Sequence, residues 1–130
     1  MITELISVGT EILLGNIVNT NSAYLSEKCA QLGLAVYYQS VVGDNPERMK
    51  MVIRTALDRS DVIILTGGLG PTEDDLTKEI TAEVMGFSLV EDEHTKELME
   101  DYLREYEKNN PQRRITRNNY KQIMVPEGSM

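Results

Sequence analysis

The sequence predicts one α/β domain built on a mostly parallel β-sheet, and three observations support that prediction. The chain has 130 residues, 41% of them hydrophobic, which suffices for one core but not for two domains of ordinary size. Segments with strand character alternate with segments of helical periodicity, as in βαβ units. Residues 62–66 form a continuous apolar run closed by Thr66, which is typical of a strand buried on both faces.

The first strand and the first long helix follow from short local signals. Residues 5–8 predict a short apolar strand that ends before Gly9. A helix is predicted over 22–32, because apolar side chains recur there at helical spacing, namely Leu25, Cys29 and Leu32. Asn21 is a candidate N-cap for this helix, and Gly33 suits the position just after its end.

The next βαβ unit has clearer boundaries. Residues 35–42 favour extended backbone and predict the second strand. Asn45 is a good N-cap and Pro46 fits the first helical turn, so a helix should follow with one apolar face made of Met49, Val52, Ile53, Ala56 and Leu57. The apolar run over 62–66 then predicts the central strand of the sheet.

Two further helices are predicted beyond the central strand. The first carries Leu76, Ile80 and Val84 and stops near Gly86. The second, over 93–107, is acidic and amphipathic, with an inward face made of Leu98, Met99, Tyr102, Leu103 and Tyr106. Residues 109–119 predict a polar loop, after which 120–125 should pack back onto the domain.

The charge distribution narrows the class of ligand. The formal net charge of −8 disfavours broad binding to nucleic acid or to an anionic membrane. Eight acidic and two basic side chains lie within 91–107, so the rest of the chain is nearly neutral. We therefore expect a small phosphorylated ligand, a nucleotide or a pterin, and no nucleic acid.

Cysteine content and hydropathy indicate the compartment. Cys29 is the only cysteine, which excludes an intrachain disulfide and a thiolate metal cluster, and we expect its thiol to be packed in the core. No apolar run approaches the roughly 20 residues that a membrane helix needs. We expect a cytoplasmic protein without a membrane partner.

Polar loops follow each of the three predicted strands, where ligands gather in open parallel sheets. In the loop over 9–21, the glycine permits close backbone approach, and the polar side chains suit a sugar, a pterin or a metal shell. The candidate binding residues there are Gly9, Thr10, Glu11, Asn19 and Asn21. The alternative is that Asn21 only caps a helix and that Glu11 is solvated.

The second loop contains Asp44, which follows a strand and directly precedes a helix N-terminus. A carboxylate at that position is stabilised by the helix dipole even without a ligand. A structural role and a functional role therefore both stay open for Asp44.

The loop over 67–75 is the most informative stretch. It begins with three glycines around Leu69 and ends in three consecutive acids. Backbone N–H groups of such a loop can hold phosphate oxygens, but three carboxylates beside them would repel a bare phosphate. A divalent cation that bridges carboxylates and phosphate resolves this conflict, and hard oxygen ligands favour magnesium or manganese. The candidate binding residues are Gly67, Gly68, Gly70, Pro71 and Thr72, and the candidate metal ligands are Asp74 and Asp75.

Two familiar nucleotide motifs are excluded in this loop. It is neither the Gly-x-Gly-x-x-Gly dinucleotide fingerprint nor a Walker loop, which would end in Gly-Lys-Ser/Thr. The structural alternative is that Asp74 or Asp75 caps the next helix while the glycines only turn the chain.

Taken together, these motifs resemble the N-terminal domain of the CinA family of competence/damage-inducible proteins. The resemblance lies in residues 9–21, 43–44, 67–77, 119–122 and 126–128. That domain is similar to the MoaB and MogA proteins of molybdenum-cofactor biosynthesis. The resemblance therefore implies a three-layer α/β/α, molybdopterin-binding-domain-like fold, and a homo-oligomer, usually a trimer.

The resemblance also implies roles for individual residues. In MoaB and MogA proteins, one aspartate after a Gly-Gly-Thr-Gly loop and another after a strand belong to the pterin and metal-handling site. These aspartates match Asp75 and Asp44, which are the catalytic candidates. Leu69, Pro71 and Thr72 depart from the MogA pattern and match the CinA pattern, which weighs against molybdopterin as the ligand.

CinA-type N-terminal domains are associated with metal-dependent hydrolysis of ADP-ribose to AMP and ribose 5-phosphate. The resemblance implies that reaction, with magnesium, manganese or cobalt. Two alternatives stay open, a module that binds molybdopterin or a nucleotide without turnover, and an oligomerisation scaffold for a C-terminal amidohydrolase domain. The sequence stops at Met130, before the Asn and Gly-Thr-Ala-Pro-Gly stretch with which the family continues its sheet and completes its phosphate pocket. We expect one domain over 1–130 that is incomplete at its C-terminal end.

Overall fold

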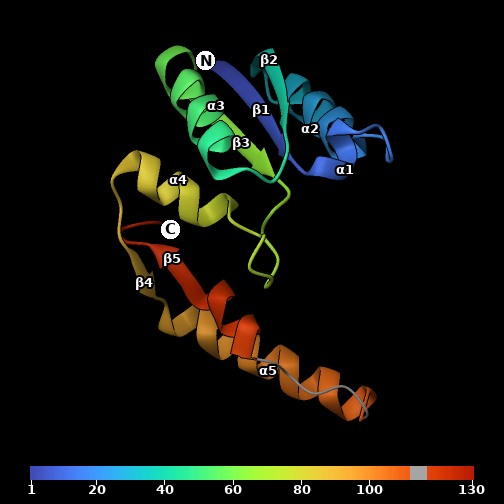
Figure 1. Ribbon diagram of the computed structural model, residues 1–130, viewed down its shortest axis with the longest axis vertical. Coiled ribbons are helices and arrows are strands. Elements are labelled where there is room, and N and C mark those ends of the chain that lie inside the picture. Colours follow the sequence, from blue (N-terminus) through green and yellow to red (C-terminus); the bar gives the residue numbers. More distant parts are fainter. Residues whose placement is uncertain (112–116) are drawn as a thin grey trace.

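The computed structural model describes residues 1–111 and 117–130, so the predicted loop over 109–119 lies partly outside the described residues. At its centre is a sheet of three parallel strands in the order β2-β1-β3. The strands are β1 (Ile2–Val8), β2 (Ala35–Val42) and β3 (Val62–Thr66). Figure 1 shows them side by side in the upper part of the molecule. The predicted parallel sheet is confirmed.

The central strand is β1 rather than β3, so the prediction drawn from the apolar run was wrong. All residues of β1 except the first are buried, whereas every residue of β3 is half-buried. β1 looks less apolar because it contains Glu4 and Ser7, but both side chains make hydrogen bonds inside the protein. A polar side chain with an internal partner is buried at little cost, and hydropathy alone does not reveal such a partner.

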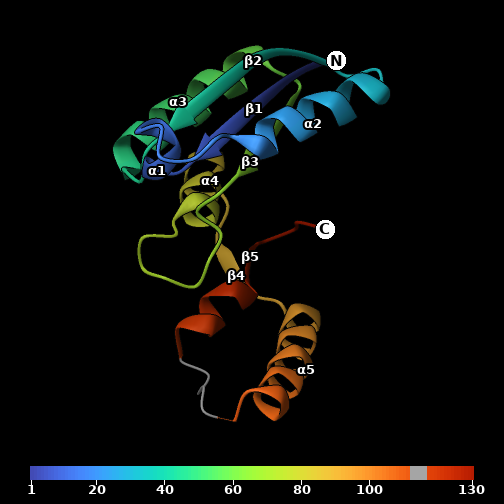
Figure 2. The ribbon, with the colours of Figure 1, turned by 90° about the vertical axis from the view of Figure 1, so that its right-hand side faces the viewer.

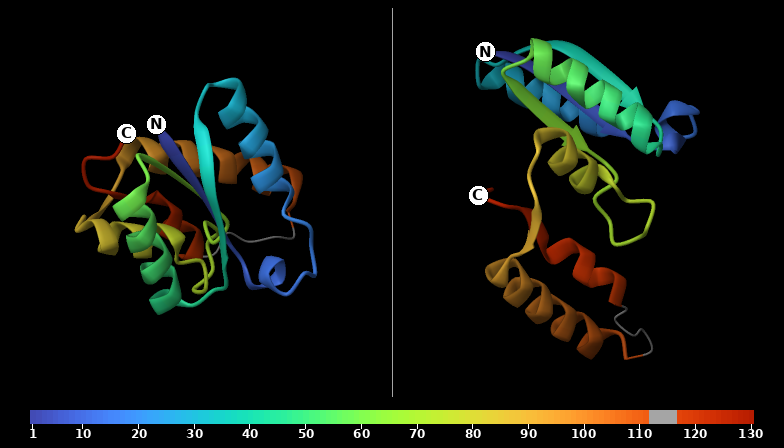
Figure 3. Two further views of the ribbon diagram at one scale, coloured as in Figure 1. Left: turned by 90° about the horizontal axis from the view of Figure 1, so that it is seen from above. Right: turned by 60° about the vertical axis from the view of Figure 1, so that its left-hand side comes forward.

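Helices cover both faces of the sheet and complete three layers. α2 (Thr20–Gln31) lies on one face, and α3 (Pro46–Arg59) lies on the other with α4 (Thr77–Met85) beside it, as the left view of Figure 3 shows. The main core cluster consists of Ile6, Val8, Val42, Met49, Ile53, Ala56 and Ile80. The three-layer α/β/α class is confirmed.

The ends of the helices follow local capping signals. Asn45 caps α3, since its Oδ1 accepts the backbone N–H three residues later at 3.0 Å, and Pro46 occupies the first helical position as predicted. α2 is capped by Asn19 instead of Asn21, because the helix begins earlier than its apolar pattern does. Asn21 is an exposed residue of the first helical turn, so its predicted capping role was wrong.

The C-terminal end of α2 gives a mixed result. Cys29 is buried, as predicted. Leu32 is exposed, because α2 ends at Gln31 and Leu32 is already its C-cap. Gly33 follows with a φ of 74°, which agrees with the predicted left-handed position after the helix.

The last third of the chain forms an arm. β4 (Leu89–Glu91) pairs with β5 (Met124–Pro126) in antiparallel fashion, and the chain between them forms α5 (Glu93–Asn109) and the 3-10 helix η1 (Arg117–Ile123). Figures 1 and 2 both show this arm extending away from the three-stranded sheet, with β5 and η1 coming back toward α4 and the loop before it. β4 and β5 were not predicted, because each has only three residues.

The inward face predicted for α5 is only partly correct. Leu103 is buried, and Met99 and Tyr106 are half-buried. Leu98 and Tyr102 are 58% and 65% exposed, because α5 packs against the short η1 and not against the sheet. Within the described residues, no helix has the length and apolar character that crossing a membrane requires.

Candidate functional site

The carboxyl ends of the three parallel strands meet at one edge of the sheet. Val8 at the end of β1 pairs with Val42 at the end of β2, and Ser7 pairs with Thr66 at the end of β3. The backbone N–H of Gly9 also donates to the Val42 carbonyl oxygen at 2.9 Å. The loops that carry Thr10, Asp44 and the glycines therefore leave the sheet from the same edge, as the sequence predicts.

Asp44 and Thr10 fasten the first two loops to each other. The Asp44 carboxylate accepts the Thr10 backbone N–H at 3.1 Å and its hydroxyl at 2.8 Å, and the Asp44 backbone N–H donates to the Thr10 hydroxyl at 3.1 Å. Thr10 begins α1 (Thr10–Leu13), a short helix within the predicted loop. The Asp44 carboxylate thus fixes the start of α1, while its side chain stays exposed.

The first two glycines of the third loop are required by packing. Gly67 has a φ of 86°, and a Cβ on it would lie 2.0 Å from the Val8 carbonyl oxygen. Gly68 has a φ of 62°, and a Cβ on it would lie 2.3 Å from the Thr77 hydroxyl oxygen. That hydroxyl donates to the Gly67 carbonyl at 2.7 Å, so the loop is held between β1 and the first turn of α4.

Asp75 closes a tight turn with Thr72. Its Oδ2 accepts the Thr72 hydroxyl at 2.6 Å and the Thr72 backbone N–H at 3.0 Å, and its own N–H donates to the Thr72 carbonyl at 3.2 Å. The hydrogen bond from the Thr72 hydroxyl lowers the pKa of Asp75 most, whereas burial raises this pKa. The N–H groups of Thr72 and Gly70 and the positive charge of Lys121 lower the pKa further. The carboxylate therefore stays ionised at neutral pH.

Neither aspartate of the predicted pair caps the following helix. The N-cap of α4 is Leu76, which provides no side-chain hydrogen bond, and Asp75 is turned back toward Thr72. Asp74 is exposed and has no hydrogen bond or ion pair with another described residue. The capping alternative is therefore wrong for both residues, and their functional roles stay predictions.

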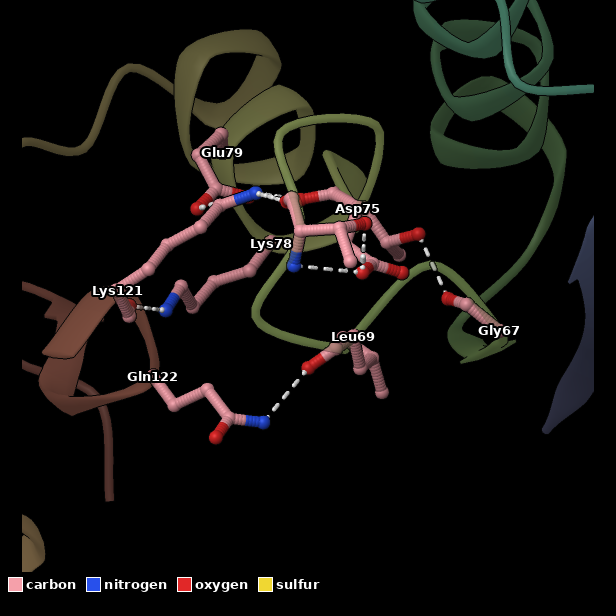
Figure 4. A network of polar contacts seen from close by, with 9 residues as sticks. Gly67, Leu69, Asp75, Lys78, Glu79, Lys121 and Gln122 are labelled. Carbon is pink, nitrogen blue, oxygen red and sulfur yellow. Dashed lines mark hydrogen bonds and ion pairs between the residues drawn. The ribbon is translucent and has the colours of Figure 1, made fainter. Parts of the chain in front are cut away.

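The structure adds residues that the sequence did not single out as site residues. Figure 4 shows that Lys121 and Gln122 of η1 and Lys78 of α4 lie around the glycine-rich loop. The Lys121 ammonium donates to the carbonyl oxygens of Thr72, at 2.7 Å, and of Asp75. The Lys78 ammonium donates to the Lys121 carbonyl at 2.7 Å, and the Gln122 amide donates to the Leu69 carbonyl at 3.4 Å.

These groups line a pocket of about 260 Å³ between the loop, α4 and η1. Its lining residues are Gly68, Leu69, Gly70, Asp75, Lys78, Glu79 and Gln122. Burial lowers the pKa of Lys78; Glu79 opposes this, and Lys121 adds to it. The pocket therefore combines the carboxylates of Asp75 and Glu79 with one ammonium group, which suits an anion that carries a bound cation better than a bare anion.

Only some of the predicted binding residues lie at this pocket. Gly68, Gly70 and Asp75 line it. Glu11 and Asn21 are exposed on α1 and α2 and do not contribute to its lining. Gly9, Thr10 and Asn19 of the same loop also lie outside this lining, and the Asn19 amide nitrogen donates to the Ser7 hydroxyl at 2.8 Å.

A metal site built by protein carboxylates alone does not fit. Within 1–111 and 117–130, no group of three or more His, Cys, Asp or Glu side chains is placed to hold an ion. Oxygen ligands suited to a hard cation are nevertheless present, and Asp74 has a carboxylate without a protein partner among the described residues. The carboxylates of Asp75 and Glu79 line the pocket, whereas Asp74 lies outside its lining. An ion in the pocket would therefore need ligand oxygens and water to complete its coordination.

The fold and these loops define a class of protein, a three-layer α/β domain with a glycine-rich, acidic loop at the carboxyl edge of a parallel sheet. A family profile described as "Probable molybdopterin binding domain" matches residues 4–127. The chain belongs to this family, and within it the chain is CinA-like.

The most informative relatives share the whole length of the chain. It is 51% identical over 129 residues to a competence-damage inducible protein of Caldicellulosiruptor bescii and 53% identical over 130 residues to one of Streptococcus pyogenes. These alignments cover 99% and 100% of this chain. The chain spans about 30% of the length of these relatives.

Solved structures support the same assignment. The protein CinA of Thermoplasma acidophilum matches with a TM-score of 0.76 and 35% identity, over 97% of this chain and 70% of that one. MoaB of Thermus thermophilus matches with a TM-score of 0.62 and 21% identity, over 96% of this chain and 78% of that one, and supports the fold alone. The predicted resemblance to CinA, MoaB and MogA proteins is confirmed.

Proposed function

We propose that this chain binds a phosphorylated nucleotide in the glycine-loop pocket and hydrolyses ADP-ribose to AMP and ribose 5-phosphate with a divalent metal. The observation that supports this proposal is the mixed charge of the pocket, where the Lys78 ammonium and the Asp75 carboxylate line the same space. A diphosphate with a bound cation suits such a site better than a bare phosphate, which the carboxylates would repel. The CinA-like assignment supports the choice of substrate.

In this proposal, Asp75 would contact the divalent ion from the wall of the pocket, with the coordination that its bonds to Thr72 leave, and Asp74, which lies next to it in the sequence and outside the pocket lining, would provide a second carboxylate. Magnesium and manganese are commonly bound in this way, by one or two carboxylates together with phosphate oxygens and water. When bound, the ion neutralises the diphosphate and lowers the pKa of a coordinated water.

The chain's own residues bind and orient the substrate. The Lys78 ammonium attracts the diphosphate. Gly67 and Gly68 adopt positive φ values, which allow the loop to lie close to the sheet edge. The Asp75 carboxylate, which stays ionised, accepts a proton or a hydrogen bond from the attacking water. Asp44, held by Thr10, lies in a neighbouring loop and orients the sugar side of the ligand.

A pterin-binding module without turnover is the second candidate, and the family description favours it. A pterin would use the same pocket, with its phosphate near Lys78. The homo-oligomer implied by the resemblance stays a prediction in both cases.

One incubation distinguishes the two functions. The chain is mixed with ADP-ribose and manganese, and AMP release is followed with and without a chelator. We expect AMP to form only when the metal is present. If no AMP forms but molybdopterin raises the melting temperature while ADP-ribose does not, the binding module replaces the hydrolase.

Substitution of Asp75 tests its role directly. Asp75→Asn keeps an oxygen that accepts the Thr72 donors, so the free energy of unfolding should change by less than about 1 kcal/mol. Metal-dependent AMP release should fall at least about 100-fold, because the amide is neither a base nor a strong metal ligand. Asp58→Asn, at an exposed position of α3, is the control. An Asp75→Asn protein with unchanged turnover would remove Asp75 from the mechanism.

A further inference from the structure

Lys121 makes a contact that joins the C-terminal arm to the glycine-rich loop. Its ammonium donates to the Thr72 and Asp75 carbonyl oxygens, across 49 and 46 residues of sequence, and it lies 3.8 Å from the Glu79 carboxylate. The Lys121 side chain is only 23% exposed. A lysine ammonium has three donors, and these three oxygens surround it.

The contact acts on the same four-residue turn that the Asp75 carboxylate closes. On one side of the turn, Thr72 donates twice to Asp75 Oδ2; on the other, Lys121 holds the carbonyls of the same two residues. Lys78, three residues after Asp75, donates back to the Lys121 carbonyl. Figure 4 shows both lysine side chains beside Asp75. The conformation of the turn therefore depends on a residue of η1.

Lys121 is not needed to attach η1 to the arm. Ile123, at the end of η1, is buried, and Met124 directly after it pairs with Glu91 of β4. η1 also packs against α5. The Lys121 ammonium therefore contacts the glycine-rich loop without being required for the attachment of η1. A variant that lacks this ammonium should keep the fold of the arm.

We propose that Lys121 is a positioning residue, whose ammonium holds the Thr72–Asp75 turn in the conformation that places the Asp75 carboxylate at the pocket. The geometry of the turn is independent of any reaction, and only the effect on turnover rests on the function proposed above. The charged groups that face this ammonium are Asp75, Glu79 and Lys78. Its charge also contributes to the lowered pKa of Asp75, after the Thr72 hydroxyl and the backbone donors.

The test uses Lys121→Met, with Lys121→Arg as the conservative variant. The matched control is Lys96→Met, since Lys96 pairs with Glu91 at 2.8 Å in the same arm, is 32% exposed and lies outside the pocket. Hydrogen exchange followed by NMR gives the protection of the Asp75 N–H, which donates to the Thr72 carbonyl. Lys121→Gln, which keeps a donor without the charge, serves as a second neutral variant should Lys121→Met destabilise the fold.

We expect Lys121→Met to accelerate exchange of the Asp75 N–H at least about tenfold, while the melting temperature changes little. Turnover of ADP-ribose should fall by about tenfold or more in kcat with a smaller change in KM, because a shifted carboxylate loses its alignment. Lys121→Arg should recover the protection of the Asp75 N–H, and Lys96→Met should leave every value unchanged.

Two outcomes overturn the inference. One is a wild-type exchange rate of the Asp75 N–H in Lys121→Met, and the other is an equal acceleration of that exchange in Lys96→Met. Absence of AMP release from the wild-type chain would overturn the proposed hydrolysis instead, and the NMR and exchange measurements would still decide the role of Lys121.

Discussion

Gly67→Ala should unfold more readily than the wild type by at least about 2 kcal/mol, because a left-handed φ costs a residue with a Cβ about 1–2 kcal/mol and a steric clash adds to it. Gly67 has a φ of 86°, and its added Cβ would lie 2.0 Å from the Val8 carbonyl oxygen. That oxygen belongs to the end of the central strand, so neither partner can move without disturbing the sheet edge. Urea denaturation measures the loss of stability.

Gly33→Ala provides the matched control. Gly33 has a similar φ of 74°, but a Cβ on it meets nothing within 4 Å. This variant should therefore show the conformational part of the loss alone, about 1 kcal/mol. Equal losses for the two variants would mean that the glycine-rich loop relaxes away from Val8, and the requirement for glycine at position 67 would then be only conformational.

The second large effect is expected for Arg59→Met. Glu4 is 0% exposed in the central strand, and Arg59 donates to it from Nε at 2.9 Å and from Nη2 at 2.6 Å. Ser60 and Ser40 also donate to this carboxylate. Without the guanidinium, a buried carboxylate lacks its charged partner, and such a carboxylate destabilises a fold by on the order of 3 kcal/mol.

The effect should depend on pH in a defined direction. Hydrogen bonding from Arg59 lowers the pKa of Glu4 most, while burial opposes it. Because the pKa of Glu4 is lower in the folded state, its ionised carboxylate stabilises the fold at pH values above the unfolded pKa, about 4.3. This stabilisation is lost as the pH falls through the folded pKa of Glu4. Arg59→Met removes the largest lowering cause, so the stability difference between the wild type and the variant should be largest near neutral pH and should shrink as the pH falls and Glu4 becomes protonated in both. Urea denaturation at a series of pH values measures this difference.

Two further variants separate charge from packing at Glu4. Arg54→Met changes an exposed arginine of the same helix and should leave the free energy of unfolding unchanged at every pH. Adding Glu4→Gln to Arg59→Met removes the unpaired charge and should restore part of the lost stability at neutral pH. A double variant no more stable than Arg59→Met would show that arginine packing over Tyr38, at 3.8 Å from the ring centroid, is the larger contribution.

The sequence predicts local features of this protein well and long-range pairings poorly. Asn45 and Pro46 mark the start of α3 because a helix cap depends on neighbouring residues only. The central position of β1 was missed because Glu4 is buried with a partner 55 residues away. The three-residue strands β4 and β5 were missed for a similar reason, since they pair across the whole of α5 and η1.

The same distinction holds at the candidate site. Convergence of the three loops at one sheet edge follows from topology, and the alternation of strands and helices predicts that topology. The contacts of individual side chains do not follow from it. The alternative that Asp75 caps a helix was wrong, because its side chain turns back to Thr72, and the capping of α2 by Asn19 was not predicted. Lys121 lies in the stretch 119–122 that carries part of the family resemblance, but nothing in its neighbourhood indicates its partners, which lie 46 and 49 residues earlier in the chain.

That separation has a consequence for the order in which the molecule forms during synthesis. The three parallel strands are complete once residue 66 has left the ribosome, whereas the wall of the pocket needs Lys121 and Gln122. Bringing η1 back to the glycine-rich loop closes the chain segment between them, and the conformational entropy that this closure costs grows with the logarithm of the segment's length. We therefore expect the sheet to form first as a scaffold and the pocket to acquire its second wall only after residue 122 has emerged.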